Sequence, residues 1–282
     1  MVERRRFGDL FAHLILGLGV AIVAFPVYLC LIGSTHEQTV IANGQMPITP
    51  GRLFVTTYYK AMFYGTSGTT HEPVGGMLLN SMVMASMIAI GKIAISIVSA
   101  YAVVYFKFPF RLPAFWLIFM TLMLPVEVRI YPTYKIAADL SLLDTYAGLT
   151  IPLIASATAT LFFRQFFMTI PDELIEASKL DGAGALRFFK DTLLPLSRTN
   201  IAALFVILFI YGWNQYLWPL LITTRDDMQT IVIGIKKMMA GADALTEWNV
   251  VLATAMLAML PPVAVVILMQ RWFVRGLVET EK

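Results

Sequence analysis

The stretch EASKLDGAGALRFFKDTLLP, at residues 176–195, is polar and carries three acidic and three basic side chains. Apolar runs of about twenty residues, the length that crosses a bilayer, lie on both sides of it. The stretch is also richer in Leu and Phe than a short connecting loop needs for its own packing. We therefore expect a folded helical element at the membrane surface. Some of its apolar side chains pack under the membrane helices, and others are available to a partner protein.

The composition is that of an integral membrane protein. Of 282 residues, 58% are hydrophobic and 14% are charged, whereas a soluble domain carries roughly 25% charged residues. The net charge of +3 is too small to suggest nucleic-acid binding. The single cysteine, Cys30, lies in an apolar run, and the three histidines lack ligand spacing, so no disulfide framework or metal site is expected. We interpret residues 1–282 as one transmembrane domain.

Six uncharged or nearly uncharged runs have the length of membrane spans, which predicts an all-α polytopic protein with six transmembrane helices. The first run follows a basic segment, Arg4–Arg6, as a signal peptide would. It is longer than a signal h-region and no small-x-small cleavage site follows, so we expect it to stay uncleaved. The runs cover residues 14–35, 73–106, 112–126, 145–163, 199–224 and 248–270.

Lys and Arg are more frequent in the flanks that face the cytoplasm if both termini lie there, so the positive-inside rule favours that orientation. The loop at 164–198 is then cytoplasmic, and the loops at 36–72 and 225–247 face the periplasm. The loop at 36–72 has turn residues at its ends and clustered aromatics. Those aromatics predict either an interfacial helix at the lipid headgroups or a docking surface for an external partner.

The cytoplasmic loop carries start and stop signals for two short helices. Pro171 suits a helix start, and Asp172 favours the positive end of the helix dipole. Gly182 is placed to end that helix in a left-handed cap. A second helix is predicted over residues 185–194, stopping at Pro195. The loop is thus expected to be a helix-turn-helix on the inner face.

Motifs for nucleotide binding are lacking. Gly91-Lys92 has no following hydroxyl residue, and Gly182-Ala183-Gly184 lacks the third glycine and a preceding strand. The sequence also contains neither His-Glu-x-x-His nor Gly-x-Ser-x-Gly. We therefore expect no ATP hydrolysis by this chain alone. If ATP drives it, a separate ATPase must dock on the cytoplasmic loop.

The spacing in this loop resembles the coupling motif, or EAA motif, of ABC importer permeases. In that motif Glu-Ala-Ala precedes a Gly and, further on, a Leu-Pro pair; here Ser178 replaces one Ala and Thr192 replaces an Ile. The resemblance assigns ATPase coupling to Glu176, Ala177, Ser178, Asp181, Gly182, Ala183, Leu194 and Pro195.

Longer segments, 121–135, 144–183, 200–221 and 269–282, are similar to the second permease subunit of glycerol-3-phosphate importers, relatives of the maltose-type sugar permeases. The resemblance implies a type I ABC importer in a bacterial inner membrane. This chain would pair with a homologous permease, above two ATP-binding subunits that hold ATP and Mg, and a periplasmic substrate-binding protein would deliver the cargo. The implied cargo is sn-glycerol-3-phosphate or a glycerophosphodiester. No cofactor would be bound by this chain.

Polar residues inside membrane helices are costly and so are candidates for the substrate path. Each has a structural alternative: a lysine that snorkels, an acid–base pair at the boundary, an amide that joins helices, or an indole in the aromatic belt. The candidates are Arg129, Glu127, Asn214, Gln215, Trp213, Trp218, Asn80 and Lys92.

Three functional classes remain distinct. The first is the ATP-coupled permease, which carries either a phosphate ester or a sugar. The second is a secondary transporter, which predicts ionisable relays at mid-membrane or inverted repeats. The third is a membrane enzyme, which needs clustered nucleophiles, acids or metal ligands that the sequence does not display.

Overall fold

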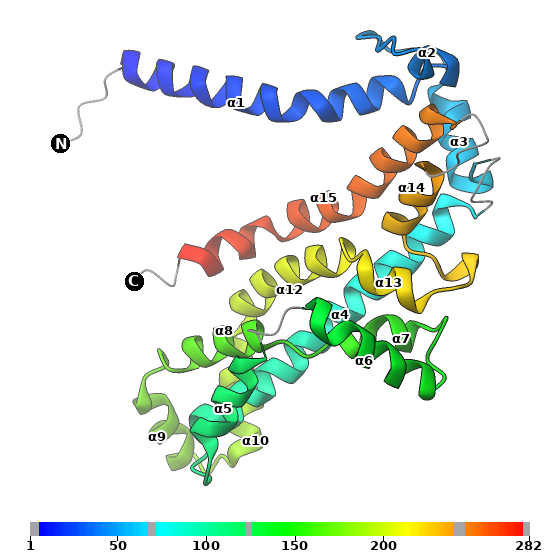
Figure 1. The fold of residues 1–282 in the computed structure, drawn as a ribbon. Coiled ribbons are helices and arrows are strands. Elements are labelled where there is room, and N and C mark those ends of the chain that lie inside the picture. The colour runs from blue at the N-terminus through cyan, green and yellow to red at the C-terminus, as the bar shows by residue number, and fades with distance from the viewer. Residues whose placement is uncertain (1–5, 67–71, 122–125, 240–245, 279–282) are drawn as a thin grey trace. The chain divides into compact units, whose positions relative to one another are not determined.

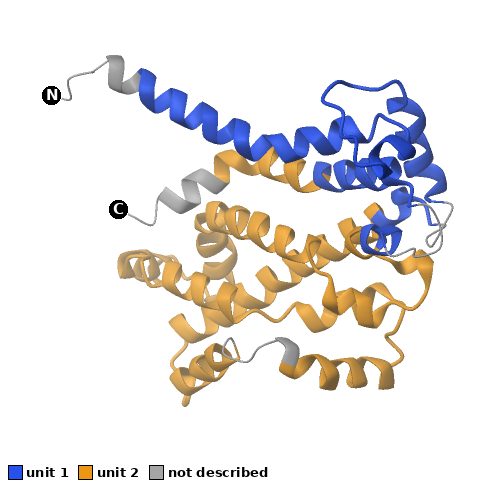
Figure 2. Cartoon of the chain, turned by 45° about the horizontal axis from the view of Figure 1, so that its top comes forward, with its two compact units in different colours: residues 1–77, 234–260 blue, residues 78–233, 261–282 orange. Residues whose placement is uncertain are grey.

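The computed structural model describes residues 6–66, 72–121, 126–239 and 246–278, and within them every regular element is helical (Figure 1). The side chains of residues 6–9, 126–127 and 273–278 lie outside the described part. The helices group into two compact units (Figure 2). Unit 1 comprises residues 1–77 and 234–260, and unit 2 comprises residues 78–233 and 261–282.

Unit 1 is built on a long apolar helix and the chain that follows it. The hydroxyl of Tyr28 donates to the carbonyl of Ile48 at 2.7 Å, and the amide of Gly51 donates to Oγ1 of Thr35 at 2.7 Å. These bonds hold the loop after the first helix against the end of that helix. The elements are α1 (Arg6–Gly33), α2 (Gln38–Ala42), α3 (Phe54–Tyr64) and the first part of α15 (Trp248–Val278).

Helix α3 is the helix expected in the aromatic loop. It buries Thr57 and Ala61 and leaves Tyr59, Phe63 and Tyr64 exposed. Lys60, on the same helix, forms an ion pair with Glu247 at 2.6 Å. The helix is therefore anchored within unit 1 and presents aromatic side chains outward, which both interpretations of this loop require.

Unit 2 holds most of the remaining helices, packed around a core of Met84, Ile88, Ala137, Leu149, Trp218 and Ile222. The rigid element of this unit is α4 (Val74–Tyr105), whose first residues belong to unit 1. The other elements are α5 (Arg111–Met120), α6 (Val126–Asp139), α7 (Tyr146–Thr150), η1 (Ile151–Leu153), α8 (Ala157–Phe167), α9 (Asp172–Leu180), α10 (Ala185–Phe188), η2 (Phe189–Leu193), α11 (Leu194–Leu196), α12 (Arg198–Trp213), α13 (Leu217–Ile222), η3 (Asp226–Met228) and α14 (Ile231–Met239), which continues into unit 1.

Three described helices are long and apolar enough to cross a membrane, or up to five if each of two bent helix pairs counts as one span. The three lie in α1, α4 and α15; the pairs join residues 146–153 to 157–167 and residues 185–196 to 198–213, with bends of 51° and 70°. Of the third predicted span, α5 is a helix of ten residues, and residues 122–125 lie outside the described part. The helical membrane fold is as predicted, and the described residues do not by themselves confirm the count of six spans.

The predicted fifth span, residues 199–224, is not one continuous helix. Helix α12 ends at Trp213, and α13 begins at Leu217. The amide of Asn214 still donates to Ile210, while that of Gln215 turns to Gly212 at 3.3 Å. A break of this kind favours amide side chains, because polar residues at a helix end satisfy local backbone groups.

A carboxylate closes the loop between α6 and α7 onto the end of α13. Asp144 accepts hydrogen bonds from the amide and hydroxyl of Thr224 and from the amide of Arg225. Desolvation raises the pKa of Asp144, but these hydrogen bonds and the nearby Arg225 charge outweigh it, so the net pKa lies below the ordinary value.

Candidate functional site

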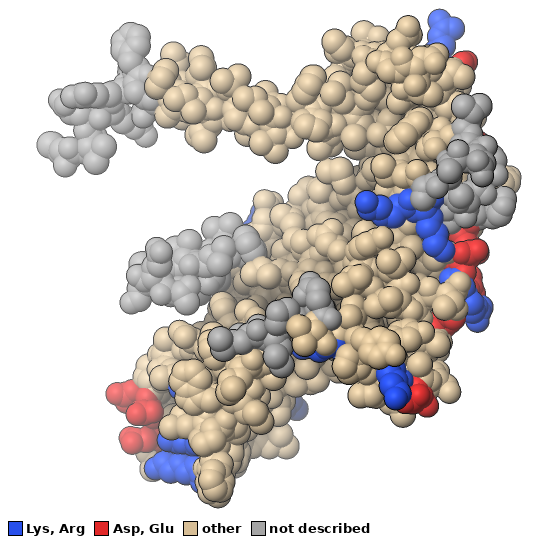
Figure 3. All heavy atoms as spheres, in the orientation of Figure 1, with Lys and Arg blue, Asp and Glu red and all other residues tan. Residues whose placement is uncertain are grey.

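The loop at residues 164–198, named the docking loop for its expected role, contains two short helical segments joined by a tight turn. Helix α9 begins directly after Pro171, with Asp172 and Glu173 in its first turn and Lys179 in its last, each at the end of the helix dipole that favours its charge. The described charged side chains of α9 gather on its exposed surface (lower left of Figure 3). The element is therefore stabilised by its own sequence.

Gly182 ends α9 as predicted. Its φ is +71°, its amide donates to the carbonyl of Lys179, and the amide of Ala183 donates to that of Ser178, both at 3.0 Å. This pair of bonds is the Schellman arrangement, which satisfies helix-end carbonyls and needs a left-handed residue. The turn direction between the two segments thus depends on one glycine.

The second segment differs from the prediction, because it does not stop at Pro195. Helix α10 passes into a π-helical turn, η2, and helix continues through α11 to Leu196 before α12 starts at Arg198. Proline has no N–H and its ring crowds the carbonyl four residues earlier. The wider π turn, which ends at Leu193 two residues before Pro195, relieves that conflict and lets the helix continue.

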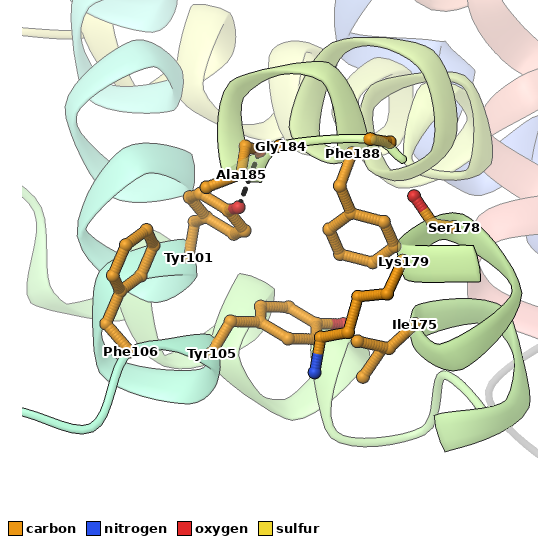
Figure 4. A pocket seen from close by; sticks show the side chains of 10 residues that line it. Tyr101, Tyr105, Phe106, Ile175, Ser178, Lys179, Gly184, Ala185 and Phe188 are labelled. Carbon is orange, nitrogen blue, oxygen red and sulfur yellow. Dashed lines mark hydrogen bonds between the residues drawn. The ribbon is translucent and has the colours of Figure 1, made fainter. Parts of the chain in front are cut away.

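Two tyrosines on α4 hold this loop. The hydroxyl of Tyr101 donates to the carbonyl of Ala185 at 2.8 Å, and that of Tyr105 donates to the carbonyl of Phe167 at 3.2 Å. The rings of Tyr105 and Phe188 meet edge to face with centroids 5.5 Å apart. Figure 4 shows these side chains around a pocket of about 180 Å³ between α4, α9 and α10. The loop is therefore positioned by α4 rather than hanging free.

The apolar side chains of the loop divide into two sets. Phe188 and Leu193 are buried and support the loop, whereas Leu180 and Leu186 are 89% and 79% exposed. The ion pair between Arg187 and Asp191 lies on the surface and contributes little by itself. Exposed leucines on a rigid element give a surface suited to a partner's groove.

The residues assigned to coupling fall on both faces of this element. Glu176, Ala177 and Asp181 are exposed, whereas Ser178 lines the aromatic pocket of Figure 4. At the far end of the loop, Leu194 is half-buried and Pro195 is exposed. Their role in coupling stays a prediction, and only the exposed members of the set are accessible for docking.

A second cavity of about 340 Å³ in unit 2 is open to the surface and brings two predicted path residues together, the buried Lys92 and the exposed Arg129. Lys92 of α4 and Arg129 of α6, 37 positions apart in the chain, both line it. Lys92 is only 7% exposed, and its Nζ lies 3.9 Å from the centre of the Tyr211 ring. The snorkelling alternative for Lys92 is therefore not the arrangement observed.

Other predicted path residues lie elsewhere. Asn80 is buried and donates to the carbonyls of Asp227 and Gln229, and the indole of Trp218 donates to the carbonyl of Gly148 at 3.0 Å. Asn80 joins a helix to a loop within unit 2, as its structural alternative proposed, whereas Trp218 is buried at 3% exposure and is not the aromatic-belt residue that its alternative proposed.

Three more candidates lie at the end of α12. Trp213 is the last residue of the helix, and Asn214 and Gln215 follow it. Trp213 is buried and stacks on Phe209, Asn214 is exposed, and Gln215 donates to the carbonyl of Tyr211 at 3.2 Å. The side chain of Glu127 lies outside the described residues.

The sequence interpretation missed four polar residues of the cavity wall: Thr121, Ser156, Thr158 and Tyr211. Ser156 is the N-cap of α8, and its hydroxyl accepts from the amide of Ala159. The Ser-Ala-Thr pattern that interrupts the predicted fourth span is a signal for this cap. Tyr211 has no comparable signal, because an aromatic residue in an apolar run is ordinary.

The apolar helices and the folded loop at residues 164–198 are the features expected of a membrane permease. A family model described as "Binding-protein-dependent transport system inner membrane component" matches residues 81–279. The chain belongs to this family, the permease subunits of ABC importers.

Several full-length relatives carry one shared name. Proteins called "sn-glycerol-3-phosphate transport system permease protein UgpE" from Agrobacterium fabrum, Rhizobium meliloti and Yersinia pestis bv. Antiqua are 59%, 57% and 55% identical, each over 100% of both chains. A solved bacterial ABC transporter that imports the acidic polysaccharide alginate has a TM-score of 0.80 at 18% identity, covering 97% of this chain and 99% of the other. That similarity confirms the fold class.

Proposed function

We propose that this chain forms part of the translocation path for sn-glycerol-3-phosphate or a glycerophosphodiester across a bacterial inner membrane. The observation that carries the proposal is full-length identity of 55–59% with relatives named for sn-glycerol-3-phosphate transport. A phosphate ester cannot cross hydrocarbon without polar partners, because an unpaired buried charge is prohibitively costly. The permease must therefore offer it a lined route.

The complex would contain this chain, a homologous permease, two ATP-binding subunits and a periplasmic substrate-binding protein. ATP and Mg would bind to the ATP-binding subunits. Their closure would move the docking loop, and the tyrosines of α4 would pass that motion to the membrane helices. Three features support this: the rigid Gly182 turn, the exposed Leu180 and Leu186, and the Tyr101 and Tyr105 anchors.

Transport by the whole complex in proteoliposomes tests the cargo. With ATP inside, the binding protein outside and radiolabelled sn-glycerol-3-phosphate as probe, we expect ATP-dependent uptake that a glycerophosphodiester competes with and a neutral disaccharide does not. Uptake of the disaccharide without uptake of either phosphate ester would assign the chain to the sugar importers instead.

Docking can be tested on the same complex. Replacing the exposed Leu186 by Asp should leave the fold intact but weaken retention of the ATP-binding subunits and lower uptake. Leu140→Asp is the matched control, because Leu140 is also exposed, at 64%, and follows α6 rather than the loop. Equal losses in the two variants would show that a charge, rather than the docking surface, is responsible.

The proposed orientation places both termini and the docking loop in the cytoplasm. In a Cys30→Ala background, an impermeant thiol reagent applied to intact spheroplasts should label Tyr64→Cys and spare Leu180→Cys. Both positions are well exposed, at 64% and 89%, so access depends on the side of the membrane. Labelling of the cysteine at position 180 from outside would reverse the orientation and remove the docking role.

A further inference from the structure

The cavity that contains Lys92 and Arg129 has an unusual wall for a membrane protein. A charged side chain at mid-membrane costs at least ~2.5 kcal/mol on insertion scales, so a buried lysine normally has an anionic or carbonyl partner. Here Nζ of Lys92 lies over the aromatic ring of Tyr211, 3.9 Å from the ring centre. Among the described residues that line the cavity, two are cations and none is a carboxylate.

A helix N-terminus opens onto the same cavity. The bent pair of helices breaks before α8, and Ser156, Ala157 and Thr158 of this start line the wall. The first amides of a helix have no partner within the helix and carry the positive end of its dipole. In membrane transporters, broken helices are a recurrent source of such binding groups.

Helix α4 fixes that broken end beside Lys92. The hydroxyl of Ser96 donates to the carbonyl of Ser156 at 3.1 Å, one turn from Lys92. Gly91 lets the break approach closely, since a Cβ there would lie 2.6 Å from Cγ2 of Ile154. The lysine and the helix start are thus held by neighbouring positions of one rigid helix.

We propose that this cavity binds the phosphate group of the cargo, a proposal that rests on the proposed function of phosphate-ester import. The ammonium of Lys92, the guanidinium of Arg129 and the first amides of α8 form a subsite for a phosphoryl anion. The ring of Tyr211 holds the lysine in place between turnovers.

The physical properties of the wall favour an anion over other occupants. A bound anion offsets the repulsion between the two cations and the cost of burying Lys92. A bound cation would instead increase the repulsion. A neutral sugar leaves both charges uncompensated. The volume of about 340 Å³ is within the range of roughly 300–1,000 Å³ that small-molecule sites occupy. A lipid headgroup carries the same phosphate chemistry, so the experiment must separate the two sources.

The transport test uses charge-removing and charge-keeping variants of the whole complex. Lys92→Met and Arg129→Gln should each raise the KM for sn-glycerol-3-phosphate by roughly tenfold or more, the effect of losing a hydrogen bond to a charged group. Lys92→Arg keeps the positive charge, so its KM should stay much closer to the wild-type value. Lys135→Gln, which removes an exposed cation from the same helix as Arg129, should transport as wild type. Unchanged KM in both Lys92→Met and Arg129→Gln would overturn the proposal.

A second readout does not depend on transport. In a Cys30→Ala background, inorganic phosphate should slow alkylation of Thr158→Cys in the assembled complex, and Lys92→Met should abolish the protection. Absence of protection with the native lysine would overturn the subsite, as expected if a carboxylate of the partner permease fills it. Protection that requires anionic lipid and ignores added phosphate would assign the cavity to a lipid headgroup.

The two readouts separate failure of the subsite from failure of the proposed function. If the wild-type complex imports a neutral disaccharide and no phosphate ester, the proposed function fails, whatever Thr158→Cys reports. If it imports phosphate esters and the Lys92 and Arg129 variants behave as wild type, only the subsite fails. If Lys92→Met prevents assembly, the KM of Arg129→Gln and the protection of Thr158→Cys by phosphate still test the subsite.

Discussion

Gly182 offers the sharpest test of the docking loop, because its replacement changes the backbone and little else. The residue has φ of +71°, and apart from Gly182 itself and its two chain neighbours no heavy atom lies within 4 Å of the position a Cβ would take. A substitution therefore meets no steric clash with its surroundings. Its cost comes from the left-handed conformation alone.

The expected costs can be ranked. Alanine in the left-handed region costs about 1–2 kcal/mol relative to glycine, and asparagine costs less because its side chain bonds locally. Valine should cost most, since a β-branched residue at positive φ is a genuine outlier. A loss of one or two kcal/mol corresponds to roughly a 5- to 30-fold change in a two-state ratio. We therefore expect Gly182→Val to weaken docking of the ATP-binding subunits more than Gly182→Ala, with Gly182→Asn close to wild type.

The assay is retention of the ATP-binding subunits on the purified permease pair, together with substrate-stimulated ATP hydrolysis and uptake at matched expression. Membrane insertion should be equal in all three variants, because Gly182 lies in an exposed turn. Wild-type stimulation in Gly182→Val would refute the argument. So would equal damage from asparagine and valine, since the backbone explanation requires the two to differ.

Three further outcomes follow from other positions. Asn80→Leu leaves buried polar groups unpaired, at about 1–3 kcal/mol each, and should lower the Tm of the purified complex by several degrees; an unchanged Tm would place water at those groups. Asp144→Asn should lower Tm at pH 7, and the difference from wild type should fade as pH falls below the ordinary value of 3.8, because a lowered folded pKa gives stability that is lost on protonation. A difference as large at pH 3 as at pH 7 would contradict this. Gly91→Ala should destabilise through the clash with Ile154, and Ile154→Ala should restore part of the loss; equal stability of the single and double variants would exclude that contact.

Features that depend on neighbouring residues were predictable from the sequence. Gly182 caps α9 as expected, because a Schellman turn is formed by six consecutive residues. The apolar runs mark α1, α4 and α15 for the same reason, since span length and composition are local properties.

Features that depend on packing were not predictable. The break after Trp213 sits in a run that is apolar on both sides, so no change of hydropathy marks it in the sequence. The meeting of Lys92 and Arg129 needs α4 and α6 to be brought together, which no local pattern encodes. The amide of Asn80 finds its partner carbonyls 147 and 149 positions away, so its structural role became clear only in the fold.

Helix α4 connects the region of the docking loop to the cavity that contains Lys92. It runs without interruption from Val74 to Tyr105, with Tyr105 bonded near the docking loop and Lys92 thirteen positions earlier in the cavity wall. At 1.5 Å per residue these positions are about 20 Å apart along a stiff rod. A tilt of about 10° pivoting at the tyrosine would swing the lysine by roughly 3 Å, about the length of one hydrogen bond. The helix is thus a lever arm on which a small rotation at one end makes or breaks a contact at the other.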